Sequence, residues 1–150
     1  MTAPNHALTG ALIGLAVGSP WLALPLALVS HFICDAVPHY TASKELIGTK
    51  RFKVQLIIEA LVCGLIVLAL GLLHPQNWMI AAIAAFLATS PDFMWIQKFL
   101  RAQSGKQQLF QRSAIIRFHA WIQWFERPIG GVVEVAWAVA MIVFISPFVR

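Results

Sequence analysis

The chain has 150 residues, of which 59% are hydrophobic and only 11% are charged. Soluble domains carry about 25% charged residues, and disordered chains combine high charge with low hydrophobicity, so this composition excludes intrinsic disorder. Two cysteines are too few for a disulfide-stapled secreted module. The formal net charge is +5, and we expect a single all-α membrane-embedded domain, residues 1–150, whose basic residues lie in loops beside anionic headgroups.

The first 34 residues contain no Lys, Arg, Asp or Glu, and Gly18-Ser19-Pro20 divides this region into two helices, about 6–17 and 21–37. At 1.5 Å per residue the first is about 18 Å long, too short to cross about 30 Å of hydrocarbon. We expect a short helix that packs on a neighbour through Gly10 and Gly14. A cleaved signal peptide is the alternative, but the basic segment that begins such a signal is missing.

Two long apolar runs follow, about 54–73 and 78–97, separated by the turn sequence His74-Pro75-Gln76-Asn77. Each has the roughly 20 residues that a membrane-spanning helix needs. A further run, about 128–149, contains Glu134 as its one charged residue before Arg150. Alternation of polar and apolar residues is missing from all three runs, so they predict helices and not strands.

The segment 111–127, which precedes the last run, has a different character. Its Ile115, Phe118, Ile122 and Phe125 recur at helical spacing, with charged and polar residues elsewhere on the helix. This pattern predicts an amphipathic helix at the membrane surface. The sequence as a whole therefore predicts a bundle of four to five transmembrane helices and one interfacial helix.

Basic residues indicate how the bundle is oriented. They gather after the second helix and again between the fourth and fifth, while the turn 74–77 contains no Lys or Arg. Because short basic loops stay in the cytoplasm, both long loops and the N-terminus are expected inside, as in a bacterial inner-membrane protein.

This orientation gathers most ionisable side chains at one depth. Glu59 lies six residues after Lys53, Asp92 six before Lys98, and six residues of helix rise about 9 Å. Asp35 and Glu134 fall at a similar shallow depth on the cytoplasmic side. The histidines predicted on that side are His6, His31, His39 and His119.

His31 and Asp35 are spaced i, i+4, so they project from one face of one helix, and His39 follows in the next turn. A single pair of this kind is often only two side chains that hydrogen-bond to each other, without a metal ion. With Asp92, His119 and His6 at the same level, it indicates a site for one or two divalent ions. Mixed imidazole and carboxylate ligands suit zinc, manganese or iron.

The same residues carry a resemblance to a known family. His6, the string Ser30-His31-Phe-Ile-Cys-Asp35-Ala-Val-Pro38-His39 and Pro91-Asp92 resemble the small membrane-bound metal-dependent hydrolases of bacteria, which are related in pattern to zinc-dependent phospholipase C. The resemblance implies a divalent metal cofactor, with zinc as the expected ion, one or two per chain, and a hydrolytic activity. It also implies metal-ligand roles for His6, His31, Asp35, Asp92 and His119.

The remaining polar residues have two interpretations each. Glu59 and Glu134 are a general base or orienting partners of the ligands, or they hold helices together by pairing with arginines. Arg112 and Arg117 are suited to gripping a phosphate.

We therefore predict a hydrolase that acts at the cytoplasmic leaflet, with a phospholipid-type phosphoester as the expected substrate and membrane lipid as its partner. The alternative is a non-enzymatic membrane protein that binds a metal ion or scaffolds a partner. Nucleic acid is disfavoured because the basic loops are short and lie next to the membrane.

Overall fold

A computed structural model of the chain describes residues 1–40, 46–104, 114–124 and 129–150. Its elements are helical, which confirms the predicted helical bundle. In chain order they are α1 (Ala3–Val17), α2 (Pro20–Ala36), α3 (Lys50–Leu73), α4 (Trp78–Thr89), the 3₁₀ turn η2 (Ser90–Asp92), α5 (Phe93–Gln103), α6 (Ala114–Ile122), α7 (Gly130–Ile145) and the 3₁₀ turn η4 (Ser146–Phe148).

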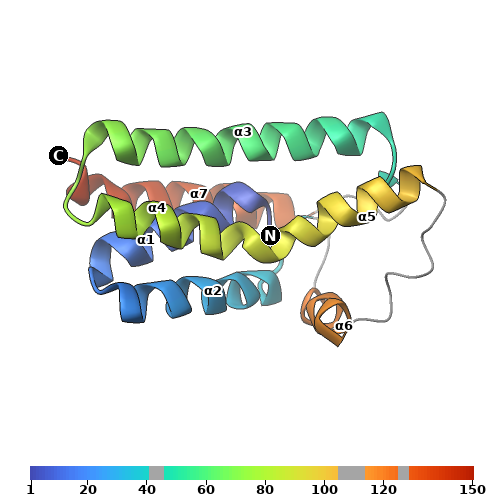
Figure 1. Cartoon of the computed structure of the whole chain (residues 1–150), viewed down its shortest axis with the longest axis horizontal. Helices are drawn as coiled ribbons and strands as arrows, with labels where there is room; N and C mark the ends of the chain where they lie inside the picture. The colour runs from blue at the N-terminus through green and yellow to red at the C-terminus, as the bar shows by residue number, and fades with distance from the viewer. Residues whose placement is uncertain (41–45, 105–113, 125–128) are drawn as a thin grey trace.

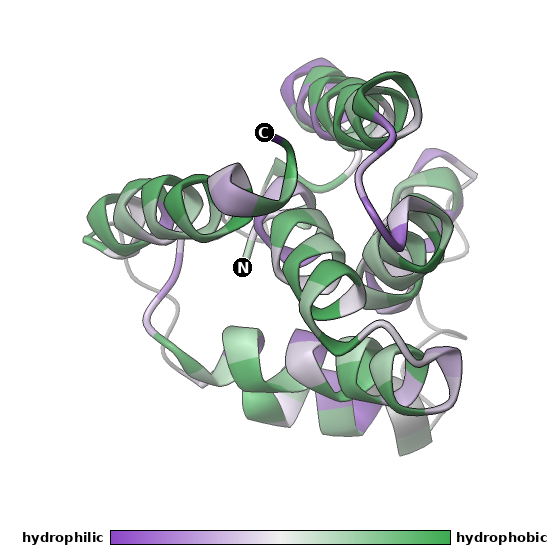
Figure 2. Ribbon diagram, turned by 90° about the vertical axis from the view of Figure 1, so that its left-hand side faces the viewer, coloured by the Kyte–Doolittle hydropathy of each residue, from purple (hydrophilic) through white to green (hydrophobic). Residues whose placement is uncertain are grey.

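Within the described residues, three stretches of helix are long and apolar enough to cross a membrane, namely Lys50–Leu73, Trp78–Gln103 and Gly130–Phe148. They match the three predicted runs, with the second extended because α4, η2 and α5 continue one another. The ribbon is hydrophobic around most of each long helix (Figure 2), and Leu65 and Val132 are more than 60% exposed. Apolar surface of this extent supports the prediction of a membrane protein.

The short helix α1 lies inside the bundle. It packs against α4, α2, α7 and α3, with α3 along one edge of the molecule and α2 along the other (Figure 1). Ala7, Ala11 and Leu15 of α1 form a buried cluster with Ala81 and Ala85 of α4. Small side chains on both helices allow this close approach.

Two glycines bring the backbones of α1 and α4 together, as the sequence predicts. A Cβ atom on Gly10 would lie 2.4 Å from the carbonyl oxygen of Ala84, and one on Gly14 would lie 2.4 Å from Cα of Ala81. Both neighbours are backbone atoms that cannot turn aside. The α1–α4 contact therefore requires glycine at these two positions.

Replacing Gly14 by leucine is expected to force α1 away from α4. Overpacking costs about 1–3 kcal/mol when neighbours can move, and here the neighbour is backbone, so the thermal midpoint in detergent should fall by several degrees. Gly131→Leu on α7 is the matched control, since a Cβ there meets nothing within 4 Å. Equal midpoints for the two variants would contradict the role of Gly14.

The turn between α3 and α4 and the helix α6 both lie where the sequence predicts them. His74 and Asn77 take left-handed backbone conformations, with φ of 49° and 66°, and form the predicted turn between α3 and α4. Helix α6 is the described part of the predicted amphipathic helix 111–127. It is 72% exposed at Trp121 but buried at His119, and it lies at the end of the bundle beside α2 (Figure 1).

Candidate metal centre

The first part of the site joins α1 to α2. His31 and Asp35 lie one helical turn apart on α2, and the Nε2 atom of His31 is 3.2 Å from Oδ2 of Asp35. His6 reaches the same carboxylate from α1, with its Nε2 atom 3.1 Å from Oδ1. The rings of His6 and His31 stack with centroids 4.0 Å apart. All three side chains are fully buried, so the i, i+4 pair faces the inside of the bundle as predicted.

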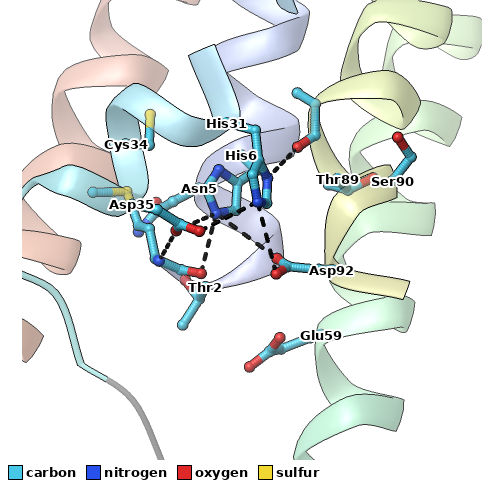
Figure 3. A network of polar contacts seen from close by, with 12 residues as sticks. Thr2, Asn5, His6, His31, Cys34, Asp35, Glu59, Thr89, Ser90 and Asp92 are labelled. Atoms are coloured by element: carbon cyan, nitrogen blue, oxygen red, sulfur yellow. Dashed lines mark hydrogen bonds and ion pairs between the residues drawn. The ribbon is translucent and has the colours of Figure 1, made fainter. Parts of the chain in front are cut away.

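Asp92 reaches the group from the junction of α4 and α5. Pro91 follows Ser90 there, and because a proline cannot continue the hydrogen bonds of an α-helix, the chain forms the 3₁₀ turn η2. The Asp92 carboxylate lies 3.7 Å from Nε2 of His6 and 4.0 Å from Nε2 of His31 (Figure 3). Its side chain is 13% exposed, whereas those of His6, His31 and Asp35 show none, so access to the group is at Asp92.

Among the described residues, His6, His31, Asp35 and Asp92 each offer one ligand atom, and these four atoms lie within 4.8 Å of one another. Figure 3 shows the four side chains converging from α1, α2 and the α4–α5 junction. We call them the His/Asp cluster. Two imidazoles and two carboxylates are a donor set suited to zinc, manganese or iron.

The hydrogen bond of His31 to the backbone tests whether the cluster fits a cation. Its Nδ1 atom lies 2.8 Å from the carbonyl oxygen of Ala88. A carbonyl only accepts, so Nδ1 carries a proton, and Nε2 is the nitrogen that faces Asp35 and would bind an ion through its lone pair. A lone pair facing carboxylate oxygens is stabilised by positive charge between them. Metal-binding histidines have this arrangement, and the cluster therefore fits a divalent ion.

Helix α6 and Gln123, which directly follows it, add two side chains that cover the cluster. His119 is buried, and its Nε2 atom lies 2.8 Å from Oδ2 of Asp35 and 2.9 Å from Nε2 of His31. Gln123, one turn later, donates a hydrogen bond of 3.0 Å to the same Asp35 oxygen. The sequence predicted His119 but not Gln123, whose i, i+4 spacing from His119 is the signal that would have found it.

The first residues of the chain form a hydrogen-bond network that joins the cluster at Asp35. The terminal amine of Met1 contacts Asp35. Glu134 of α7 accepts hydrogen bonds from the backbone amide of Thr2, at 3.1 Å to each oxygen, from the Thr2 hydroxyl and from the Asn5 amide at 3.1 Å. Both oxygens of Glu134 thus accept hydrogen bonds from Thr2 and Asn5, and not from a ligand histidine or an arginine among the described residues.

Glu134→Ala is expected to destabilise the protein by about 1–3 kcal/mol, because the amides of Thr2 and Asn5 would lose a buried acceptor. Glu134→Gln, which keeps one carbonyl oxygen, should lose less. Thermal unfolding in detergent measures both. A folded Glu134→Ala protein should keep its metal content, and loss of the metal without loss of stability would instead make Glu134 a ligand.

Three other predicted site residues, His39, Arg112 and Arg117, are not part of the His/Asp cluster as the structure describes it. His39 is buried, with Nδ1 2.8 Å from the Val37 carbonyl oxygen and with Nε2 lacking a hydrogen-bond partner in the described part of the chain. It is not one of the four clustered ligands. Arg117 is exposed on α6. Arg112 lies outside the described residues.

Glu59 of α3 stands next to the cluster. Its Oε1 atom accepts a hydrogen bond of 2.9 Å from Gln55, one turn earlier on the same helix. Glu59 and Asp92 together line two adjoining cavities, one of about 400 Å³ and one of about 40 Å³. Figure 3 places the Glu59 carboxylate beside Asp92, at the accessible end of the cluster.

Comparison with family models, with curated proteins and with solved structures finds no match for this chain.

Proposed function

We propose that the protein is a membrane-embedded, metal-dependent hydrolase whose site opens at the cytoplasmic leaflet of a bacterial inner membrane. The observation that carries the proposal is the convergence of buried histidine nitrogens and carboxylate oxygens from separate helices. The hydrogen bond from His31 to Ala88 adds to it, because it uses Nδ1 and leaves the inward-facing Nε2 as the nitrogen that can bind an ion. The family resemblance of the sequence motifs points the same way.

His6, His31, Asp35 and Asp92 would hold the ion, with His119 beside them as a further ligand. When bound, a divalent ion such as Zn²⁺ supplies Lewis-acid activation of water at neutral pH. Asp92 is the accessible member, so the reacting bond would approach from its side. Glu59 is the better placed general base, because the Glu134 oxygens are already bonded to Thr2 and Asn5.

A phosphoester is the proposed substrate class. Lys98 lies near the accessible end, with its Nζ atom 3.7 Å from the ring centroid of Trp95, and Trp95 lines both cavities. The exposed Arg117 is on the helix that carries His119. Cations of this kind attract an anionic phosphate and can bind it by charge-assisted hydrogen bonds.

The test is hydrolysis by protein purified from membranes, measured on phospholipid vesicles and on a water-soluble phosphodiester. Removing metal with a chelator should abolish turnover, and adding back Zn²⁺ or Mn²⁺ should restore it. Tight metal binding without turnover of either substrate would overturn the enzymatic proposal. The cluster would then belong to a non-enzymatic metal-binding protein.

A further inference from the structure

The larger cavity is an apolar groove between α1, α3 and the α4–α5 span. Its volume of about 400 Å³ falls in the range of about 300–1,000 Å³ that ligand sites occupy. The lining is apolar apart from Glu59, Thr89 and Asp92. On α3 the groove is bordered by small residues, Ala60, Cys63 and Gly64, and these leave the space open.

The groove is continuous with the polar end of the site. The smaller cavity, of about 40 Å³, is bordered by polar groups that include Thr2, Gln55 and Gln123. Both cavities share Glu59 and Asp92 in their walls. A polar chamber and an apolar chamber therefore meet at the accessible end of the His/Asp cluster, an arrangement that suits an amphiphile.

The dimensions and opening of the groove match a lipid tail. Along α3 its lining runs from Leu56 to Val67, twelve residues that rise about 16 Å, which is close to half of the roughly 30 Å hydrocarbon core. Phe86 and Ile96 line the groove and are 56% and 47% exposed, so it opens at the surface of the bundle. Two of its walls are candidate membrane spans, so that surface faces lipid.

We propose that this groove holds one hydrocarbon chain of a phospholipid substrate, with the headgroup where the two cavities meet. This assignment rests on the proposed hydrolase function for its catalytic meaning, but binding of the chain can be measured without turnover.

The experiment uses the full chain in phosphatidylcholine vesicles that contain a fraction of phosphatidylglycerol with a photoreactive diazirine in one acyl chain. Mass spectrometry then maps the labelled residues. Lipid held in the groove should label Cys63 and Val67 more strongly than Leu61 and Leu65, which are exposed on the same helix but do not line the groove. Equal labelling of both sets would indicate ordinary surrounding lipid and would overturn the inference.

Gly64→Leu is the blocking variant, because a Cβ atom at this position meets nothing within 4 Å and the larger side chain would extend into open space. Excluding about two methylene groups of the lipid should reduce groove labelling by about tenfold. Gly131→Leu, also in open space but outside the groove, should label like the wild type. Ala60→Leu is the second blocking variant, in case Gly64→Leu does not fold.

Turnover separates this inference from the proposed function. If Gly64→Leu and Ala60→Leu hydrolyse long-chain lipid as well as Gly131→Leu does, the groove assignment fails while the hydrolase stands. If the wild type is labelled in the groove but hydrolyses nothing, the hydrolase fails while the groove remains a lipid site. If both hold, the blocking variants should lose activity on long-chain lipid and keep it on a water-soluble phosphodiester.

Discussion

On the proposed metal centre, the wild type is expected to carry a divalent ion when purified, and His31→Ala and Asp35→Ala are expected to lose it. His31→Ala removes the ligand atom Nε2, which the hydrogen bond between Nδ1 and the Ala88 carbonyl holds in its orientation. Asp35→Ala removes the carboxylate that His6, His31 and His119 all contact. Loss of an orienting partner alone costs about 10–100-fold in metal affinity, so loss of a ligand should cost at least about 100-fold. Metal analysis and titration in a chelator-buffered series measure this.

Asp35 is buried, so its removal also endangers the fold. Asp35→Asn keeps the volume of the side chain and separates loss of metal from loss of structure, provided its gel-filtration profile and helical circular dichroism match the wild type. His74→Ala is the control. His74 follows the last residue of α3, is not a member of the His/Asp cluster, and its replacement should leave the metal content unchanged. Unchanged metal content in both His31→Ala and Asp35→Ala would end the metal-centre proposal.

The sequence predicts the helices well because a membrane limits their length. An uncharged run of about 20 residues has few ways to satisfy its backbone except as a helix, so 54–73 and 128–149 recur in the structure with ends shifted by a few residues. Gly10 and Gly14 likewise predict close packing of α1, which the α1–α4 contact confirms. These are local properties of composition and spacing.

The site could be predicted only in part, because sequence indicates the depth of a residue in the membrane better than the direction it faces. Depth correctly grouped His6, Asp35 and Asp92, which meet in the cluster. The same criterion also selected His39, which the structure leaves outside it. Helices that are apolar on all sides carry little periodicity, so their rotation is set by packing contacts that a single sequence does not reveal.

The contacts of the N-terminus show the same limit. Asn5 and Glu134 are 129 residues apart along the chain, and nothing in either segment marks them as partners. The groove beside Gly64 was missed for a related reason, since it is formed jointly by α1, α3, α4 and α5. A cavity depends on how the helices are placed around it, and no single segment specifies that placement.

Glu59→Gln is expected to reduce turnover of the phosphoester by about 10²- to 10⁴-fold, the usual contribution of a general base. Glutamine has nearly the same shape but cannot accept the proton, and Glu59 is not one of the four clustered ligands, so metal content and thermal midpoint should stay at wild-type values. Steady-state kinetics with the metal-loaded protein would show the loss in kcat, with KM little changed.

Gln55→Ala is the matched control, because it removes the 2.9 Å hydrogen bond to Glu59 but leaves the carboxylate in place. It should therefore retain most of the activity that Glu59→Gln loses. If the two variants are equally active, Glu59 is not the general base, and its hydrogen bond to Gln55 only stabilises one turn of α3. If Glu59→Gln instead loses its metal, Glu59 contributes to holding the ion, and the base must be sought among the other groups around Asp92.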